Sequence, residues 1–248
     1  MAGAEAGHIA LLALAWHLTG SASQASLVLL AAVASRTIGA PLAGWIGDHL
    51  DRRRVIIVSE LAVAGALVGL ATAGSMPALL AWCAVHAFAA STCGAALDAA
   101  VGGLVPAQDL PRANSTIGMA RTAGHMLGPV LGGLAVAAWG AQAAFLLDAA
   151  SSVVAAALVI GIRGCVGGSA ARAADPNAAI AGSDRSPMAG MRVLSADPIL
   201  RLLVAGWAGM CVCFAFVTAA ELPLAVEFGV NEPGLGAIVT AWCLGSLV

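Results

Sequence analysis

Ionisable side chains interrupt the long apolar stretches of this sequence, and they are the residues best placed to do chemistry. They are Glu5, Arg36, Asp98, Arg121, Asp148 and Glu221. A carboxylate in an apolar setting can take up and release a proton, whereas an arginine stays charged and needs a partner. Because a charge is costly against lipid, we expect each of these side chains to face a cavity or an opposite charge.

Two pairs follow from the depths of these residues along the helices that we expect. Glu5 lies roughly 20 Å and Arg36 roughly 15 Å from the same membrane face, at about 1.5 Å per residue, so the two can meet. They are our first candidate for a proton site. Asp98 and Arg121 both lie toward the opposite face and are the second candidate pair. The alternative is that both are static ion pairs that only hold the helices together.

The elements that must position these residues are membrane-spanning helices. Hydrophobic residues make up 60% of the 248 positions and charged residues only 10%, whereas soluble domains have about 25% charged residues. Several apolar runs reach the roughly 20 residues that cross a bilayer. We expect helices at residues 2–18, 26–47, 55–74, 77–104, 113–138, 142–162 and 198–228, with an eighth beginning at Gly234. The predicted fold class is an all-α membrane protein.

A change of composition divides the chain into three parts. Residues 163–197 are rich in Gly, Ala, Ser, Pro, Arg and Asp and contain no long apolar run, which indicates a linker. Residues 1–162 then form an N-terminal transmembrane half of six helices. Residues 198–248 form the start of a second half, with its first helix and part of the next.

Arginine is distributed unevenly among the connections between these helices. The loops after the second and fourth helices contain Arg52, Arg53, Arg54 and Arg112. The segment from the sixth helix to the start of the seventh contains Arg163, Arg172, Arg185, Arg192 and Arg201, and the other turns contain none. Basic residues are enriched in cytoplasmic loops. We therefore expect a multi-pass protein of the inner or plasma membrane whose second, fourth and sixth loops are cytoplasmic.

The charged stretch between two apolar runs, residues 44–54, resembles a family signature. It reads G-W-I-G-D-H-L-D-R-R-R and is similar to the pattern G-x-L-A-D-R-x-G-R-R between helices 2 and 3 of the major facilitator superfamily. The matching residues are Asp48, Arg52 and Arg53, while His49 and Asp51 stand where the family often has Arg and Gly.

The resemblance implies a conformational latch formed by Gly44, Asp48, Arg52, Arg53 and Arg54. Asp48 would cap or pair with the inner ends of neighbouring helices. The arginines would bridge to carboxylates of the other half in one conformation and release them in the other. Candidate partners within this chain are Glu60 and Asp148. The alternative is a solvated turn whose arginines only set the topology.

A glycine pattern in the fifth expected helix also resembles this superfamily. Gly124, Gly128, Pro129, Gly132 and Gly133 fit G-x-x-x-G-P-x-x-G-G, which is typical of its proton-antiporting exporters. Small residues at this spacing let helix backbones approach closely, and a proline can kink a helix. The resemblance implies that the stretch also seals the transport cavity against proton leak. Close packing without that role is the alternative.

Further stretches, including residues 145–149 and 197–201, are similar to the branch that contains macrolide-efflux and enterobactin-export proteins. This implies proton-coupled export of drugs, macrolides or siderophore-like small molecules across the bilayer by alternating access. It also implies twelve helices, so we expect a truncated chain that lacks most of the C-terminal half. A non-transporting fragment, or a half-bundle that needs a partner chain, is the alternative. An importer of the same fold fits the glycine pattern less well.

Other classes of function find little support in the sequence. The net charge of −2 gives no indication of nucleic-acid binding. The sequence contains no phosphate-binding loop and no nucleophile elbow, and its six cysteines lack the spacing of metal ligands. We therefore expect no enzymatic activity, no cofactor and no metal.

Overall fold

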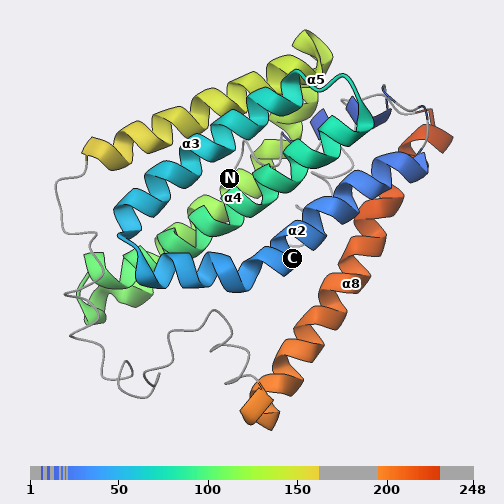
Figure 1. Cartoon of the computed structure of the whole chain (residues 1–248). Coiled ribbons are helices and arrows are strands. Elements are labelled where there is room, and N and C mark those ends of the chain that lie inside the picture. Colours follow the sequence, from blue (N-terminus) through green and yellow to red (C-terminus); the bar gives the residue numbers. More distant parts are fainter. Residues whose placement is uncertain are drawn as a thin grey trace.

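The computed structural model describes residues 7, 10–11, 14–16, 18, 20, 22–161 and 195–229, and every regular element in these ranges is a helix. In chain order they are α2 (Ala22–His49), α3 (Arg52–Ala71), α4 (Met76–Leu104), the 3-10 turn η1 (Ala107–Asp109), α5 (Leu110–Gly161) and α8 (Pro198–Glu227). The predicted all-α class is confirmed (Figure 1).

Three stretches of the described helices are long and apolar enough to cross a membrane. They are Arg52–Ala71, Met76–Gly102 and Leu131–Gly161. The described apolar part of α8, Pro198–Cys213, is shorter. Helices suit this setting because hydrocarbon offers no hydrogen-bond partner, so the backbone groups must bond to one another within the element.

The element α5 consists of two helical limbs rather than one straight helix. Gly140 has φ 81° and ψ 166°, a conformation that lies outside the helical region and that a side chain would oppose. Figure 1 shows the chain running the length of the bundle, reversing, and returning beside α3. The break that we expected between the helices at residues 113–138 and 142–162 therefore lies at Gly140, which separates residues 110–139 from residues 141–161.

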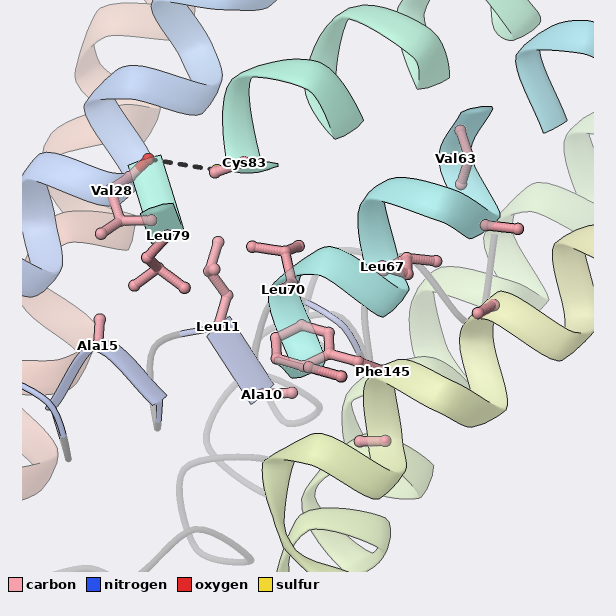
Figure 2. Close-up of a cluster of buried hydrophobic side chains, with 14 of the residues drawn as sticks. Ala10, Leu11, Ala15, Val28, Val63, Leu67, Leu70, Leu79, Cys83 and Phe145 are labelled. Carbon is pink, nitrogen blue, oxygen red and sulfur yellow. Dashed lines mark hydrogen bonds between the residues drawn. The ribbon is translucent and has the colours of Figure 1, made fainter. Parts of the chain in front are cut away.

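The core of the bundle lies where α3 is enclosed by its neighbours. Helix α4 packs against both α2 and α3, and α3 also packs against α5. Figure 2 shows the apolar side chains that fill these contacts. Among the largest fully buried ones are Phe145, Leu67, Leu79 and Val28. Close packing of this kind is what holds helices together in lipid, where burial of apolar surface gives no preference for one helix contact over another.

The start of α3 differs from our prediction, and the reason is a helix cap. We expected a charged loop at residues 48–54, but α3 begins at Arg52 and only Leu50 and Asp51 separate it from α2. The Asp51 carboxylate accepts hydrogen bonds from the backbone N–H groups of Arg53 (2.9 Å) and Arg54 (3.2 Å). An N-terminal cap of this kind satisfies donors that have no partner within the helix. The three arginines consequently lie in the first turn of α3.

The element α8 lies beside α2 (Figure 1). Its start is capped by Asp197, whose carboxylate accepts from the backbone N–H of Ile199 at 2.8 Å. Large apolar side chains along its first half, including Leu202 and Trp207, are exposed. The helix expected from Gly234, most of the expected linker and much of the expected first helix lie outside the described residues, so the three-part division of the chain stays a prediction.

Candidate functional site

The charged end of the bundle is formed by the end of α2 and the start of α3. The His49 ring stacks on Trp45, with ring centroids 4.8 Å apart, and its Nδ1 lies 3.0 Å from the Trp45 carbonyl oxygen. A carbonyl oxygen only accepts, so Nδ1 carries the hydrogen in this contact. The His49 side chain is thus folded back onto α2 rather than extended toward the arginines.

The signature residues of α2 contribute in different ways. A side chain at Gly44 would meet nothing within 4 Å, whereas one at Gly47 would come within 3.8 Å of the Ala96 backbone of α4. Gly47 is therefore the position where α2 approaches α4 closely. Asp48 lies in the last turn of α2, and its side chain is outside the described part of the structure.

Arg53 connects the start of α3 to the end of α5. Its Nη2 donates a hydrogen bond to the carbonyl oxygen of Ile160, at a separation of 107 residues. Ile160 is the penultimate residue of α5, and the last carbonyls of a helix have no partner within it. A cation at this position also interacts favourably with the negative end of the helix dipole. Arg53 therefore contacts the end of α5 through a backbone carbonyl, and the expected bridge from these arginines to carboxylates stays a prediction.

Asp98 of α4 and Arg121 of α5 form an ion pair. Arg121 Nη2 contacts Asp98 Oδ1, and 37% and 61% of the two side chains, respectively, are exposed. The structure thus brings together the two residues that their depths suggested as a pair. An ion pair as exposed as this one holds α4 and α5 together only weakly.

Arg36 lies in the middle of α2, and its side chain is exposed. Helix α2 packs against α4 along its length. The partner that we expected for it, Glu5, lies outside the described residues. The Glu5–Arg36 pair therefore stays a prediction.

Asp148 is the buried acidic residue among the candidates. Its side chain is 8% exposed, on the limb of α5 that packs against α3. Ser151 Oγ lies 3.2 Å from Asp148 Oδ1 and donates to it or to the Asp148 carbonyl oxygen at 2.8 Å. The described hydrogen-bond partner is thus a neutral hydroxyl.

The sequence suggested Glu60 only as a partner for the arginines at residues 52–54. The structure instead places it against Cys93 of α4, whose Sγ lies 3.4 Å from Glu60 Oε1. The helical position of Glu60 was readable from the sequence, but the thiol opposite it was not, because the two residues meet only when α3 and α4 pack. Helices α3 and α4 thus each contribute a polar group to their contact.

The glycine motif of α5 lies on the first limb, where the backbone is helical from residue 124 to residue 133. Gly128, Gly132 and Gly133 are buried and Gly124 is partly buried, whereas the Pro129 side chain is outside the described part. The described non-helical residue of α5 is Gly140, so the reversal of the chain occurs there. Close packing at the glycines accords with the burial, and a role in sealing a cavity stays a prediction.

Metal chemistry receives no support from the residues that the structure describes. Within them, no group of three or more His, Cys, Asp or Glu side chains could hold a metal ion.

The family model described as Major Facilitator Superfamily matches residues 3–248 of this chain. The chain belongs to the Major Facilitator Superfamily. This superfamily consists of membrane transporters, so the chain is a multi-pass membrane protein of a transporter family, with a lipid bilayer around it and small molecules as its class of substrate. The Major Facilitator Superfamily is a family of transporters and not of enzymes. A search among curated proteins gave no match.

Proposed function

We propose that this superfamily member is a proton-coupled exporter of small molecules, such as drugs, macrolides or siderophore-like compounds, that works by alternating access. The observation that carries proton coupling is the burial of Asp148 inside the helical core, where its described hydrogen-bond partner is a neutral hydroxyl. A buried carboxylate is costly while it is charged. Taking up a proton removes that cost, and releasing it restores the charge.

The direction of transport rests on the glycine motif of α5. Burial of Gly128, Gly132 and Gly133 supports a tightly packed helix, as the resemblance to proton-antiporting exporters implies. The latch of Gly44, Asp48 and Arg52–Arg54 would then fix one conformation from the cytoplasmic side. Arg53 already holds the end of α5, which supports a role for this turn in positioning helices.

Flux measurements in inside-out membrane vesicles test the proposal. We expect vesicles that contain the chain to accumulate a fluorescent dye or a macrolide when the lumen is acidic, and a protonophore to abolish the accumulation. Vesicles without the chain are the control. Accumulation that is unaffected by the protonophore would contradict proton coupling. Movement of the dye or macrolide out of the acidic lumen, instead of into it, would contradict export.

The alternative, a half-bundle that works with a partner chain, is favoured by α8. Its exposed apolar side chains, among them Ile199, Leu202, Leu203 and Trp207, form a surface that either lipid or more protein must cover. Chemical cross-linking in native membranes distinguishes the two: a defined larger complex supports a partner chain, and a monomer supports lipid.

A further inference from the structure

The first limb of α5 carries a polar stripe along one face. Asn114, Arg121 and His125 follow one another at intervals of seven and four residues, so they share one face of the helix. Asn114 and His125 are exposed, and the Arg121 side chain is partly exposed. The stripe extends over eleven residues, or about 16 Å along the helix axis. Polar groups thus occupy a long part of a helix in a membrane protein.

The same face of α5 changes its character beyond His125. Gly128 and Gly132 continue the face at helical spacing, and both are buried. The described stretch of α5 that is apolar enough to cross a membrane also begins only at Leu131. The polar, exposed part of this face therefore ends where the helix becomes closely packed. We expect water to reach the face at the start of α5 and not beyond these glycines.

Asp98 indicates that the stripe lies at the depth of the membrane. It belongs to the apolar stretch Met76–Gly102 of α4 and forms the ion pair with Arg121. Charged groups at this depth are costly against hydrocarbon, yet both side chains of the pair are partly exposed. Helix α4 packs extensively on α2 and α3 but only sparsely on α5. We therefore expect the exposed sides of the pair to face water.

The ion pair uses only part of the hydrogen-bonding capacity of Arg121. Its Nη2 contacts Asp98 Oδ1, and among the described residues this is the contact that the structure gives the guanidinium. A guanidinium has five N–H donors in a planar fork, which matches a carboxylate through two parallel hydrogen bonds. Donors of Arg121 thus remain for a further acceptor.

The two partners of the pair differ in how readily a ligand can replace them. A cationic ligand would take the place of Arg121 on Asp98 and leave the arginine without a counter-charge, and an arginine stays protonated in proteins. An anionic ligand would take the place of Asp98 instead. Asp98 is the more exposed partner, at 61% against 37%, so water can solvate its carboxylate once it is released. Exchange of Asp98 for an anion is therefore the less costly of the two.

We propose that Arg121 binds the carboxylate of an anionic small-molecule substrate, which replaces Asp98, and that Asn114 and His125 border this site along α5. The inference rests on the proposed transport function and names the class of its substrate. It gives the pair a role other than the proton binding that depth suggested. Acidic siderophore-like compounds fit such a site better than basic drugs do.

Ligand binding to the purified chain in nanodiscs tests this site without a proton gradient. The probes share one fluorophore: dansylglycine has a carboxylate, its amide is neutral, and dansylcadaverine is an amine cation. We expect dansylglycine to bind about tenfold more tightly than the amide, measured by fluorescence against empty nanodiscs. Arg121→Gln should abolish this difference. Asp98→Asn should preserve or increase it, because the competing carboxylate is gone.

The matched control is Arg112→Gln. Arg112 has the same charge and lies on the same limb, but nine residues from Arg121 and hence on the opposite face of the helix, where it is exposed. This variant should bind dansylglycine like the wild type. The different effects of Arg121→Gln and Asp98→Asn are decisive, since either substitution alone breaks a purely structural ion pair.

Three outcomes overturn the proposal. Equal loss of dansylglycine binding in Arg121→Gln and Asp98→Asn indicates a structural pair. Tighter binding of dansylcadaverine that depends on Asp98 indicates a cation site. Equal binding of dansylglycine and its amide by the wild type excludes an anion site.

A second variant keeps the test decisive if Arg121→Gln does not accumulate in membranes. Arg121→Lys keeps the charge but loses the fork, so it should bind dansylglycine several-fold more weakly than Arg112→Lys does, and equal binding would overturn the proposal. Anion binding without proton-driven accumulation in vesicles would leave this site standing and remove the exporter proposal. Accumulation without anion binding would do the reverse.

Discussion

The hydrogen bond between Arg53 and Ile160 makes a prediction about the end of α5. Replacing Arg53 with Ala removes the donor that lies 2.5 Å from the Ile160 carbonyl oxygen. We expect the last turn of α5, residues 157–161, to open more often, while the centre of the bundle stays closed. Local opening at helix ends requires far less free energy than global unfolding, so a single lost contact is measurable there.

The expected size follows from the type and surroundings of this hydrogen bond. Hydrogen bonds to charged groups contribute about 1.5–3 kcal/mol when well buried. Arg53 is only partly buried, and pairs near solvent contribute roughly 0.2–1 kcal/mol, so we expect about 0.5–1 kcal/mol. At 1.4 kcal/mol per factor of ten, this is about a two- to fivefold loss of protection.

Amide hydrogen exchange of the chain in nanodiscs measures this loss directly. Arg54→Ala is the matched control, because Arg54 lies in the same turn, has the same charge and is more exposed. Arg53→Lys should recover part of the protection, since lysine retains one donor. Equal loss of protection in Arg53→Ala and Arg54→Ala would show that net charge, and not this hydrogen bond, controls the end of α5.

Two further changes test the packing and the ion pair. Gly69→Ala places a side-chain carbon where the Trp82 ring lies, so we expect the free energy of unfolding to fall by about 0–2 kcal/mol. The side chain of Gly65→Ala meets nothing within 4 Å, so this variant should be neutral or more stable by up to about 1 kcal/mol. Thermal unfolding in detergent compares the two, and equal midpoints would contradict the close contact. Asp98→Asn should lower the free energy of unfolding by less than about 1 kcal/mol, and by less still at high salt, because the ion pair with Arg121 is exposed. A decrease of several kcal/mol in the same measurement would mean that the pair is buried in the membrane-embedded protein.

The helices themselves were largely predictable because their signals are local. Apolar runs gave the spans, and Gly140 gave the turn between the limbs of α5. The start of α3 was misplaced although its signal was present, since Asp51 stands directly before an arginine-rich helix start and is a typical cap. We interpreted the charged residues 48–54 as a loop. Arg52, Arg53 and Arg54 instead fit the first turn of α3, because Asp51 caps the N–H groups of that turn.

The contacts between helices were predictable only where depth was informative. Asp98 and Arg121 have opposite charges at similar depths, which sufficed to pair them. The bond from Arg53 to Ile160 could not be anticipated, because a backbone carbonyl leaves no mark on residue type and lies 107 positions away. The contact of Cys93 with Glu60 likewise depends on the rotation of α3 and α4 about their axes.

The charges within the bundle fall into two physical classes, and the proposed proton coupling would use only one of them. Asp98 is exposed and lies against Arg121, so the protein already compensates its charge. Asp148 is buried and its described hydrogen-bond partner is the Ser151 hydroxyl, so under the proposed coupling a proton would be the ligand that compensates its charge. Asp148 shares its limb of α5 with Ile160, twelve residues or about 18 Å further along. Proton binding at Asp148 and the hydrogen bond from Arg53 to Ile160 would then act on the same helical segment, and this segment would link protonation in the core to the turn between α2 and α3.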